Sequence, residues 1–365
     1  PFFSTVQLVM AGNDVEGLRY GVIDTPEKYW LSWREPSDVA NPLDRAITQL
    51  CSKQRLLELI HDFMVFDAGV KKTARHNQYF GVKSAQARIA KREGGIIWHT
   101  QGSGKSLTMV WLAKWIREHQ RDARVLLITD RTELDDQIAS TYTHCGRANS
   151  NTDQATNSAA LRLMLRDQNR RYVFGLIQKY RERVTEAYSE RDDIIVISDE
   201  AHRTQYGRLA LNMRKGLPRA KFLGFTGTPL IDAGEKQLTR EVFGDYVSIY
   251  DFQRAVSDGA TLPLFYENAG EKLKIIDPKV SERIAQHIEA AKQAATLDDP
   301  WTDEKEEKLY REFARDYPIL TSPTRLDKVA QDVVDHFHQR WRVVEDGGGK
   351  ALMVCLAKIT FPKMH

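Results

Sequence analysis

The chain has 365 residues, of which 42% are hydrophobic, and carries a formal net charge of +3. This length predicts at least two domains with a sizeable core, whereas so small a charge does not by itself indicate nucleic-acid binding. Three isolated cysteines without a C-x-x-C pair argue against a disulfide framework and a zinc site. No apolar run reaches the roughly 18 residues of a membrane span, and Pro1 opens the chain without a signal-like segment. We therefore expect a piece of a longer, cytoplasmic protein.

The first part of the chain is expected to be the end of a β-rich unit. Thr5–Met10 is predicted to be a strand, because turn-forming glycines follow it. Apolar residues recurring on one face predict a helix over Lys53–Phe66.

Residues 95–225 alternate short apolar runs with helical stretches. Strands that are apolar on both faces and separated by helices predict a parallel sheet covered on each side, an α/β fold. Five strands are expected: Gly95–Trp98, Val125–Ile128, Tyr172–Ile177, Ile194–Ile197 and Phe222–Phe225.

The last hundred residues contain material for a second α/β domain. Residues 262–266 are predicted to be a strand, and the charged residues 298–316 a solvated helical insertion. Ser322-Pro323 is typical of a helix start, and residues 347–349 are expected to turn into a strand over Ala351–Leu356. The chain ends nine residues later, so we expect this domain to be incomplete.

The stretch HTQGSGKS, His99–Ser106, follows the first expected strand and precedes a helix over Leu107–Ile116. It departs from the strict phosphate-loop pattern, which has glycine where His99 stands. Glycines let backbone N–H groups approach phosphates, and a helix N-terminus adds positive potential. Lys105 would reach the β and γ phosphates and Ser106 the magnesium ion. The alternative is a glycine turn whose lysine points to solvent.

Two further strand ends carry polar groups. Asp199 and Glu200 end the run IIVIS, where α/β sheets place their ligands. Asp199 would hold the magnesium hydration shell, and Glu200 would polarise an attacking water; the alternative is that they cap the next helix. In FLGFTGTPL, Thr226 and Thr228 could sense the γ phosphate, although such a segment also suits an ordinary turn.

G-x-G-K-S, D-E-A-H and T-G-T-P, in this order, resemble motifs I, II and III of superfamily-2 helicase-type motors. WHTQGSGKS, DEAHRTQYG and GFTGTPL are similar to the motor (R) subunit of type I restriction–modification enzymes, over roughly residues 1–357. In that family the first loop position need not be glycine. The resemblance implies a RecA-like P-loop NTPase sheet with helices on both faces, using ATP and Mg²⁺.

The resemblance also implies a domain order. Residues 1–70 would be the C-terminal part of an α/β nuclease-type domain with a linking helix, and residues 71–258 the first, ATP-binding RecA-like domain. Residues 259–365 would start a second RecA-like domain with a helical insertion, truncated.

The site residues implied by the resemblance fall into four groups. The catalytic candidates are Lys105, Asp199, Glu200 and His202, and those for magnesium are Ser106 and Asp199. The nucleotide would contact Gln78, Thr100, Gln101, Gly102, Ser103, Gly104, Lys105, Ser106, Thr226, Gly227 and Thr228. The DNA-contact candidates are Asp130, Arg131, Gln137, Gln178 and Lys179. Gln78 would read adenine, with Gln86 as its alternative; a solvated helix residue is the other interpretation of Gln78, and a helix-surface histidine that of His202.

The function implied is an ATP-dependent double-stranded DNA translocase of a type I restriction endonuclease. It would drive DNA movement before cleavage of unmethylated foreign DNA, with methylation and specificity subunits as partners. Another superfamily-2 DNA or RNA helicase, a nucleotide-gated assembly module without turnover, and a small-molecule P-loop kinase are the alternatives.

Two catalytic parts of the family are not expected in this chain. Glu306-Glu307-Lys308 spells the E-x-K of a nuclease, but it lies in the charged stretch without a partner aspartate in register. No Q-x-x-G-R-x-x-R segment follows Leu356, and an arginine finger is worth on the order of 10³–10⁵ in rate. We therefore expect slow hydrolysis of Mg-ATP and no cleavage of DNA.

Overall fold

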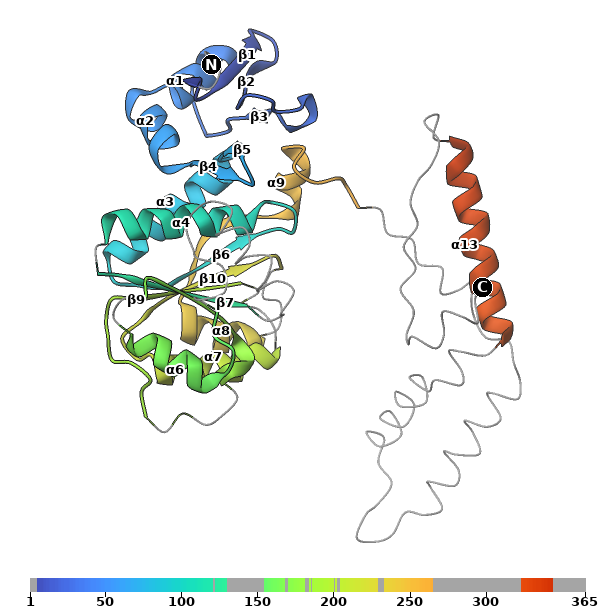
Figure 1. The fold of residues 1–365 in the computed structure, drawn as a ribbon. Helices are drawn as coiled ribbons and strands as arrows, with labels where there is room; N and C mark the ends of the chain where they lie inside the picture. The colour runs from blue at the N-terminus through green and yellow to red at the C-terminus, as the bar shows by residue number, and fades with distance from the viewer. Residues whose placement is uncertain are drawn as a thin grey trace. The chain divides into compact units, whose positions relative to one another are not determined.

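The structure is a computed structural model. It describes residues 5–120, 122–129, 154–167, 170–180, 184, 186–199, 201, 204–228, 233–264 and 323–343. The chain divides into two compact units, Pro1–Pro263 and Leu264–His365 (Figure 1). Within the described residues, no helix is both long and apolar enough to cross a bilayer.

A six-stranded sheet forms the centre of the first unit, with strand order β11-β6-β10-β9-β7-β8 and only parallel pairs. The five predicted strands are confirmed to within a residue or two at their ends. They are β6 (Gly95–His99), β7 (Arg124–Thr129), β8 (Tyr172–Leu176), β9 (Ile194–Ser198) and β10 (Lys221–Thr226). The sequence did not predict the edge strand β11 (Tyr246–Tyr250), whose residues are mostly half-buried.

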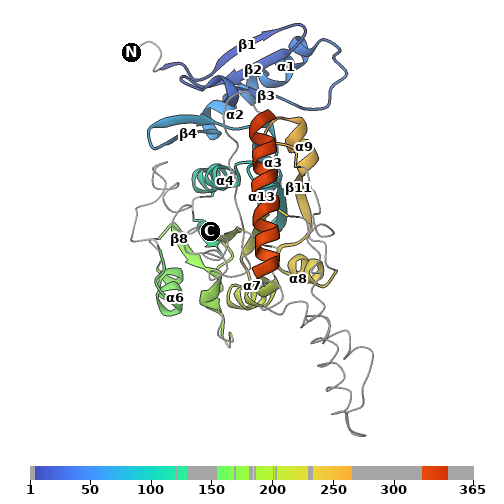
Figure 2. The same ribbon diagram turned by 90° about the vertical axis from the view of Figure 1, so that its right-hand side faces the viewer.

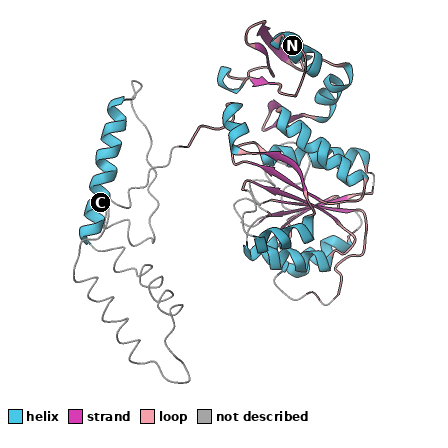
Figure 3. Ribbon diagram, turned by 180° about the vertical axis from the view of Figure 1, so that it is seen from behind, coloured by secondary structure: helices cyan, strands magenta, loops and turns pink. Residues whose placement is uncertain are grey.

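Helices cover both faces of this sheet, as predicted (Figures 1 and 3). One face lies under α3 (His76–Ala90) and α4 (Lys105–His119), and the other under α6 (Ser158–Arg166), α7 (Thr204–Gly216) and α8 (Ala233–Phe243). Adjacent strand residues enter separate cores: Ile97 packs in the cluster that includes α4, whereas Ile96 packs in the cluster that includes α7. Burial on both faces explains why the strands are apolar throughout.

The N-terminal strands form an antiparallel sheet of β1 (Val9–Asn13), β2 (Gly17–Gly21) and β3 (Leu31–Ser32), followed by helix α1 (Pro42–Leu50) (Figure 2). The predicted strand over Thr5–Met10 is wrong at its start, because the pairing begins at Val9 opposite Gly21. Pairing with β2, rather than the apolar run, therefore defines this strand.

The helix predicted over Lys53–Phe66 ends earlier. Helix α2 spans Lys53–Asp62, and the next residues form the hairpin of β4 (Met64–Asp67) and β5 (Val70–Thr73). The two turn residues, Ala68 and Gly69, have φ values of 49° and 82°. This left-handed pair suits a tight hairpin turn, which redirects the chain where helical periodicity alone would have continued it.

The N-terminal sheet and the six-stranded sheet share one hydrophobic core. Tyr20 of β2, Trp33 after β3 and Tyr79 of α3 all belong to the cluster that contains the α4 side chains. The Tyr20 hydroxyl donates to the carbonyl oxygen of Ala74 at 2.8 Å, immediately before α3. The two sheets are therefore packed together within the first unit.

In the second unit, helix α13 (Pro323–Val343) begins at the proline where a helix start was predicted (Figure 2). Leu326 of this helix is buried, whereas Val333 is exposed. The strand predicted over residues 262–266 is wrong for residues 262–264, which are not in a strand. Its remaining residues, the charged stretch 298–316, the turn at 347–349 and the strand over 351–356 lie outside the described residues.

Candidate active site

The loop between β6 and α4, which we call the phosphate loop, has the backbone conformation that close contact with phosphates requires. Gly102 and Gly104 have φ values of +82° and +83°, in the left-handed region that favours glycine. Gly104 is the N-cap of α4, and no side chain of the described residues caps this helix start. Unpaired N–H groups of the first turn therefore remain for an anion.

Two neighbouring elements hold this loop. At its start, the backbone N–H of Thr100 donates to the carbonyl oxygen of Tyr250, at the end of β11, over 2.9 Å. At its end, Nε2 of Gln78 donates to the carbonyl oxygens of Ser103 (3.3 Å) and Gly104 (3.0 Å). A Cβ on Gly104 would collide with this amide. Glycine at this position therefore allows both the left-handed turn and the hydrogen bonds from Gln78.

Gln78 is buried, and both the nitrogen and the oxygen of its side-chain amide are hydrogen-bonded. Its Oε1 accepts the backbone N–H of Arg75 over 2.8 Å, which caps α3. The side chain thus supports the phosphate loop in this structure, and contact with adenine stays a prediction. The alternative Gln86 is buried, and its Nε2 has no hydrogen-bond partner in the described part of the chain.

Lys105 lies against the segment that follows β10. A Cβ added to Gly227 would lie 3.1 Å from its Nζ and 3.6 Å from the backbone nitrogen of Gln101. Thr226 is buried; its hydroxyl donates to the carbonyl oxygen of Thr228 over 2.9 Å and accepts the Thr228 N–H over 3.3 Å. The Thr226 hydroxyl therefore closes its own turn, and sensing of a γ phosphate stays a prediction.

Asp199 directly follows β9 and is 7% exposed. Its backbone N–H donates to the carbonyl oxygen of Ile128 in β7 over 2.9 Å. Strands β6 and β9 both pair in parallel with β10, so their carboxyl ends meet at one edge of the sheet. That edge carries both Asp199 and the phosphate loop. Glu200 and His202 lie outside the described residues.

His99, which stands at the usual glycine position, points away from the loop into the protein. The ring is 1% exposed, Nε2 lies 2.8 Å from Oγ of Ser248, and a Cβ on Gly81 would lie 2.8 Å from Cε1. Burial, followed by the charges of Lys105 and His76, lowers the pKa of His99 to about 3. The ring is therefore neutral near pH 7.

The candidate DNA contacts are only partly described. Gln178 and Lys179 lie in the short 3-10 helix Ile177–Tyr180 after β8. The Lys179 amine donates to the carbonyl oxygen of Ala155, so it is engaged within the protein here. Asp130, Arg131 and Gln137 lie outside the described residues, and all five contacts stay predictions.

A network of polar side chains that the sequence did not predict lies at the edge of this site. Asp258 accepts a hydrogen bond from the Tyr250 hydroxyl at 2.8 Å and lies 3.1 Å from Nε2 of His76 and 2.7 Å from the guanidinium of Arg34. Burial raises the pKa of Asp258, but the bonds from His76 and Tyr250 and the charge of Arg34 outweigh it and leave the pKa low. No local sequence pattern predicts such a network, because its members come from three separate segments.

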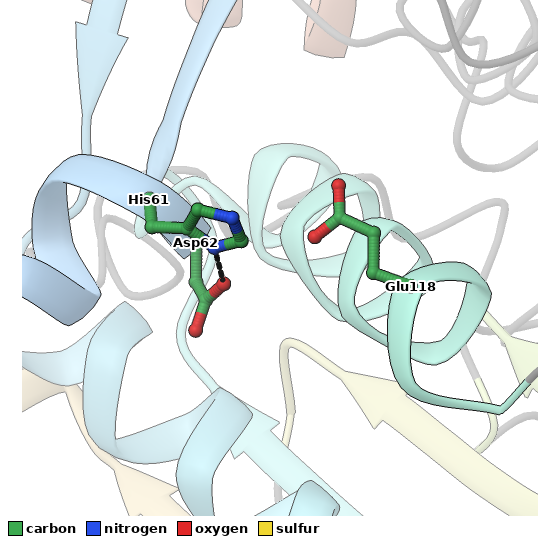
Figure 4. A group of neighbouring side chains, drawn as sticks. All are labelled: His61, Asp62 and Glu118. Carbon is green, nitrogen blue, oxygen red and sulfur yellow. Dashed lines mark hydrogen bonds and ion pairs between the residues drawn. The ribbon is translucent and has the colours of Figure 1, made fainter.

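Among the described residues, one group of three side chains could hold a metal ion: His61 and Asp62 at the end of α2, and Glu118 of α4 (Figure 4). Nδ1 of His61 lies 2.6 Å from Oδ1 of Asp62, and His61 is largely exposed. Proximity is the only feature that favours an ion here, so we assign the cluster no role.

The loop residues fit a magnesium-bound triphosphate. Ser103 Oγ is buried without a hydrogen-bond partner among the described residues, within the loop that would surround the phosphates. Lys105 offers a cation, and Asp199 offers carboxylate oxygens of the kind that magnesium prefers. A parallel sheet with a glycine loop opening a helix is the arrangement of the P-loop NTPase class.

The chain belongs to the SWI2/SNF2 ATPase family, whose model matches residues 77–297. It is 34% identical over 345 residues to the type I restriction enzyme HindI endonuclease subunit of Haemophilus influenzae, covering 86% of this chain and 31% of that relative. A relative in Methanocaldococcus jannaschii with a name of the same kind is 34% identical over 339 residues, covering 87% of this chain and 30% of its own length. The predicted resemblance to restriction-enzyme motor subunits is confirmed, although the chain spans only about a third of each relative.

A solved structure is also similar. It is a nuclease-deletion mutant of the Type ISP restriction-modification enzyme LlaGI in complex with a DNA substrate mimic. The identity is 16%, the match covers 74% of this chain and 30% of that chain, and the TM-score is 0.38. A likeness of this size supports no conclusion about function.

Proposed function

We propose that this chain is part of the motor of a type I restriction endonuclease, which uses ATP to move double-stranded DNA before unmethylated foreign DNA is cut. One observation carries the proposal: the Lys105 amine lies where the phosphate loop meets the loop after β10, at the sheet edge that also bears Asp199. The names of the relatives supply the biological setting.

In this proposal, the residues at this edge of the sheet have separate roles in binding and hydrolysing ATP. The loop N–H groups and Lys105 bind the β and γ phosphates and neutralise their charge. Ser106 and Asp199 would hold magnesium, which supplies charge neutralisation at the phosphoryl group. Glu200 orients and polarises the attacking water, and His202 links the site to the partner lobe.

We also propose a domain order for the chain. Residues 1–70 would be the end of a nuclease domain, residues 71–258 the first RecA-like lobe, and residues 259–365 the start of the second. Closure of two lobes on ATP would move the contacts at Asp130, Arg131, Gln137, Gln178 and Lys179 along the DNA backbone. Since such contacts are largely ionic, DNA affinity should fall steeply with salt.

The proposed partners are the methylation and specificity subunits, which would choose the DNA site, and the proposed setting is the cytoplasm. Nothing in the motor mechanism requires recognition of bases, because phosphate contacts position a protein without specifying a sequence.

The test is ATP hydrolysis by the purified chain in the presence of duplex DNA, single-stranded DNA or RNA, with Lys105→Ala as the inactive control. We expect slow hydrolysis that duplex DNA stimulates and Lys105→Ala abolishes. Stimulation by RNA alone would assign the chain to another helicase class. ATP binding without turnover under every condition would assign it to a nucleotide-gated assembly module.

A further inference from the structure

The segment that follows helix α9 lies beside the phosphate loop. Helix α9 (Phe252–Ser257) comes after the edge strand β11, and the first unit ends shortly after it, at Pro263 (Figure 2). A Cβ built on Gly102, in the middle of the phosphate loop, would lie 3.4 Å from Cγ2 of Thr261. The methyl group of Thr261 therefore lies next to the backbone of the loop.

The backbone after α9 determines where Thr261 lies. Gly259 has a φ value of 66°, and this left-handed residue turns the chain back onto the end of the helix. The N–H groups of Ala260 and Thr261 both donate to the carbonyl oxygen of Ala255, over 2.8 and 3.2 Å. Ala255 itself is fully buried. The position of Thr261 beside the loop therefore depends on the position of the end of α9.

Asp258, the C-cap of α9, holds this helix end against three other elements. Its Oδ1 lies 2.7 Å from the guanidinium of Arg34, in the segment after β3. Its Oδ2 accepts the Tyr250 hydroxyl over 2.8 Å and lies 3.1 Å from Nε2 of His76, at the start of α3. The Asp258 side chain is only 12% exposed, so water screens these contacts less than it screens a surface ion pair.

Tyr250 connects the same carboxylate to the start of the phosphate loop. Its hydroxyl donates to Asp258, and its carbonyl oxygen accepts the N–H of Thr100 over 2.9 Å. Tyr250 is 4% exposed, so the surrounding protein leaves it little freedom to shift. Asp258 is therefore linked to the loop by two routes, through Tyr250 to its start and through Thr261 to its middle.

The phosphate loop needs support from outside itself. Glycine loses more conformational freedom on ordering than any other residue, and the loop contains both Gly102 and Gly104. Contacts that already hold a loop in its bound conformation reduce the entropy lost when a ligand binds. Gln78 supports the end of this loop, whereas Tyr250 and Thr261 contact its start and its middle.

We propose that Asp258 and Thr261 are positioning residues for the phosphate loop. The Asp258 carboxylate fixes the end of α9, and the Thr261 methyl and the Tyr250 carbonyl then hold the loop in the conformation that accepts phosphates. Both residues act through the loop rather than on ATP itself. The effect on nucleotide binding rests on the proposed function, whereas the effect on the loop does not.

The first test is amide hydrogen exchange of the ligand-free chain, followed in a peptide that covers the loop. Thr261→Ser removes the methyl and keeps the hydroxyl, so the hydrogen-bonded amides of Thr100 and Ser103 should exchange about fourfold faster, the factor expected for one buried methyl group. Thr261→Val is the conservative variant. It keeps the methyl and removes a buried hydroxyl that has no partner among the described residues, so it should restore the parent's exchange. Unchanged exchange in Thr261→Ser, or equal acceleration in Thr261→Val, overturns the proposal.

Asp258→Ala should speed exchange of the loop about tenfold, because it removes several hydrogen bonds to a charged group. Asp192→Ala is the matched control, since Asp192 pairs with Arg92 over 3.2 Å on an exposed surface, and it should leave exchange of the loop unchanged. The double variant of Asp258→Ala and Thr261→Ser should exchange little faster than Asp258→Ala alone, because both act through one segment. Effects that multiply would overturn the link between the two residues. The Thr261 variants keep the test decisive if Asp258→Ala does not fold.

Calorimetric titration of ATP separates this proposal from the proposed function. Thr261→Ser and Asp258→Ala should weaken ATP binding by about the same factors, fourfold and tenfold, while Thr261→Val binds like the parent. Faster exchange of the loop with undiminished ATP affinity would overturn the positioning role. A parent chain that binds no ATP would instead contradict the proposed function, and the exchange of the loop would still decide whether Asp258 and Thr261 hold it.

Discussion

The side-chain amine of Lys105 lies beside Gly227, close enough that a Cβ at position 227 would be 3.1 Å from Nζ. Lys105 opens the helix after β6, and Gly227 follows β10, the strand paired with β6. Glycine at 227 therefore leaves the space in which the amine lies, next to the loop that would hold the phosphates.

Gly227→Ala should lower ATP hydrolysis with little change in stability. The added methyl would crowd the Lys105 amine by a few tenths of an ångström and displace it from the phosphates. A loss of about 1.4 kcal/mol of transition-state stabilisation corresponds to a tenfold lower kcat/KM, which steady-state kinetics would detect.

Gly175→Ala is the matched control. A Cβ there would lie 3.7 Å from Leu161 in α6 and 3.8 Å from Ile128 in β7, and both are ordinary van der Waals contacts. Its kinetics should equal those of the parent chain. Equal activity of Gly227→Ala and the parent would show that the Lys105–Gly227 contact does not matter for ATP.

Gln78→Ala should lower the free energy of unfolding and weaken nucleotide binding. The substitution removes the bonds from Gln78 to the carbonyl oxygens of Ser103 and Gly104 and to the Arg75 N–H. The Gly104 oxygen keeps its bonds from Thr108. Loss of buried hydrogen bonds costs about 1–3 kcal/mol, which denaturant unfolding would measure. ATP affinity should fall in the same variant, because the loop geometry would no longer be held.

Gln54→Ala provides the comparison for this prediction. Gln54 is an exposed helix residue that bonds only to Glu58 among the partners described, so both stability and ATP affinity should remain near those of the parent. A Gln78→Ala chain with normal ATP affinity would contradict the supporting role of Gln78.

The buried His99 ring should make stability depend on pH. Its pKa is lowered from 6.5 to about 3 in the folded chain, chiefly by burial. Between these values the unfolded state binds more protons, so stability is lost as the pH falls below about 6.5, with a slope near 1.4 kcal/mol per pH unit. Unfolding free energies of the parent and His99→Gln, measured from pH 7 to pH 5, should show a shallower slope in the variant.

Ser248→Ala separates burial from hydrogen bonding as the cause of this slope. It removes the hydroxyl that lies 2.8 Å from Nε2 of His99 but leaves the ring in place. We expect a lower stability at every pH with the slope retained. A slope abolished by Ser248→Ala would assign the effect to the hydrogen bond instead.

The central sheet was predictable because its strands are buried on both faces. Runs such as Ile194–Ile197 contain no polar position that would allow another interpretation. The edge strand β11 has only one buried residue, Tyr250, so its apolar signal is weak. The end of α2 at Asp62 is set by pairing of β4 with β5, which a helical pattern in Lys53–Phe66 cannot reveal.

The candidate site was predictable only where a single segment of the chain contains the whole sequence motif. Glycines 102 and 104 with Lys105 are recognisable in the sequence because a single loop must surround phosphates. The bonds from Gln78 to that loop, and the place of His99 between Gly81 and Ser248, join distant segments. Tertiary packing decides such contacts, and no local spacing encodes them.

The most direct test of the account is calorimetric titration of ATP, with and without Mg²⁺, into the parent chain, Lys105→Ala and Asp199→Asn. If the amine and the carboxylate act on one metal-bound triphosphate, the parent binds more tightly with Mg²⁺, Lys105→Ala loses binding, and Asp199→Asn loses the Mg²⁺ effect alone. Undiminished heat from Lys105→Ala, or a Mg²⁺ effect that survives in Asp199→Asn, would contradict it.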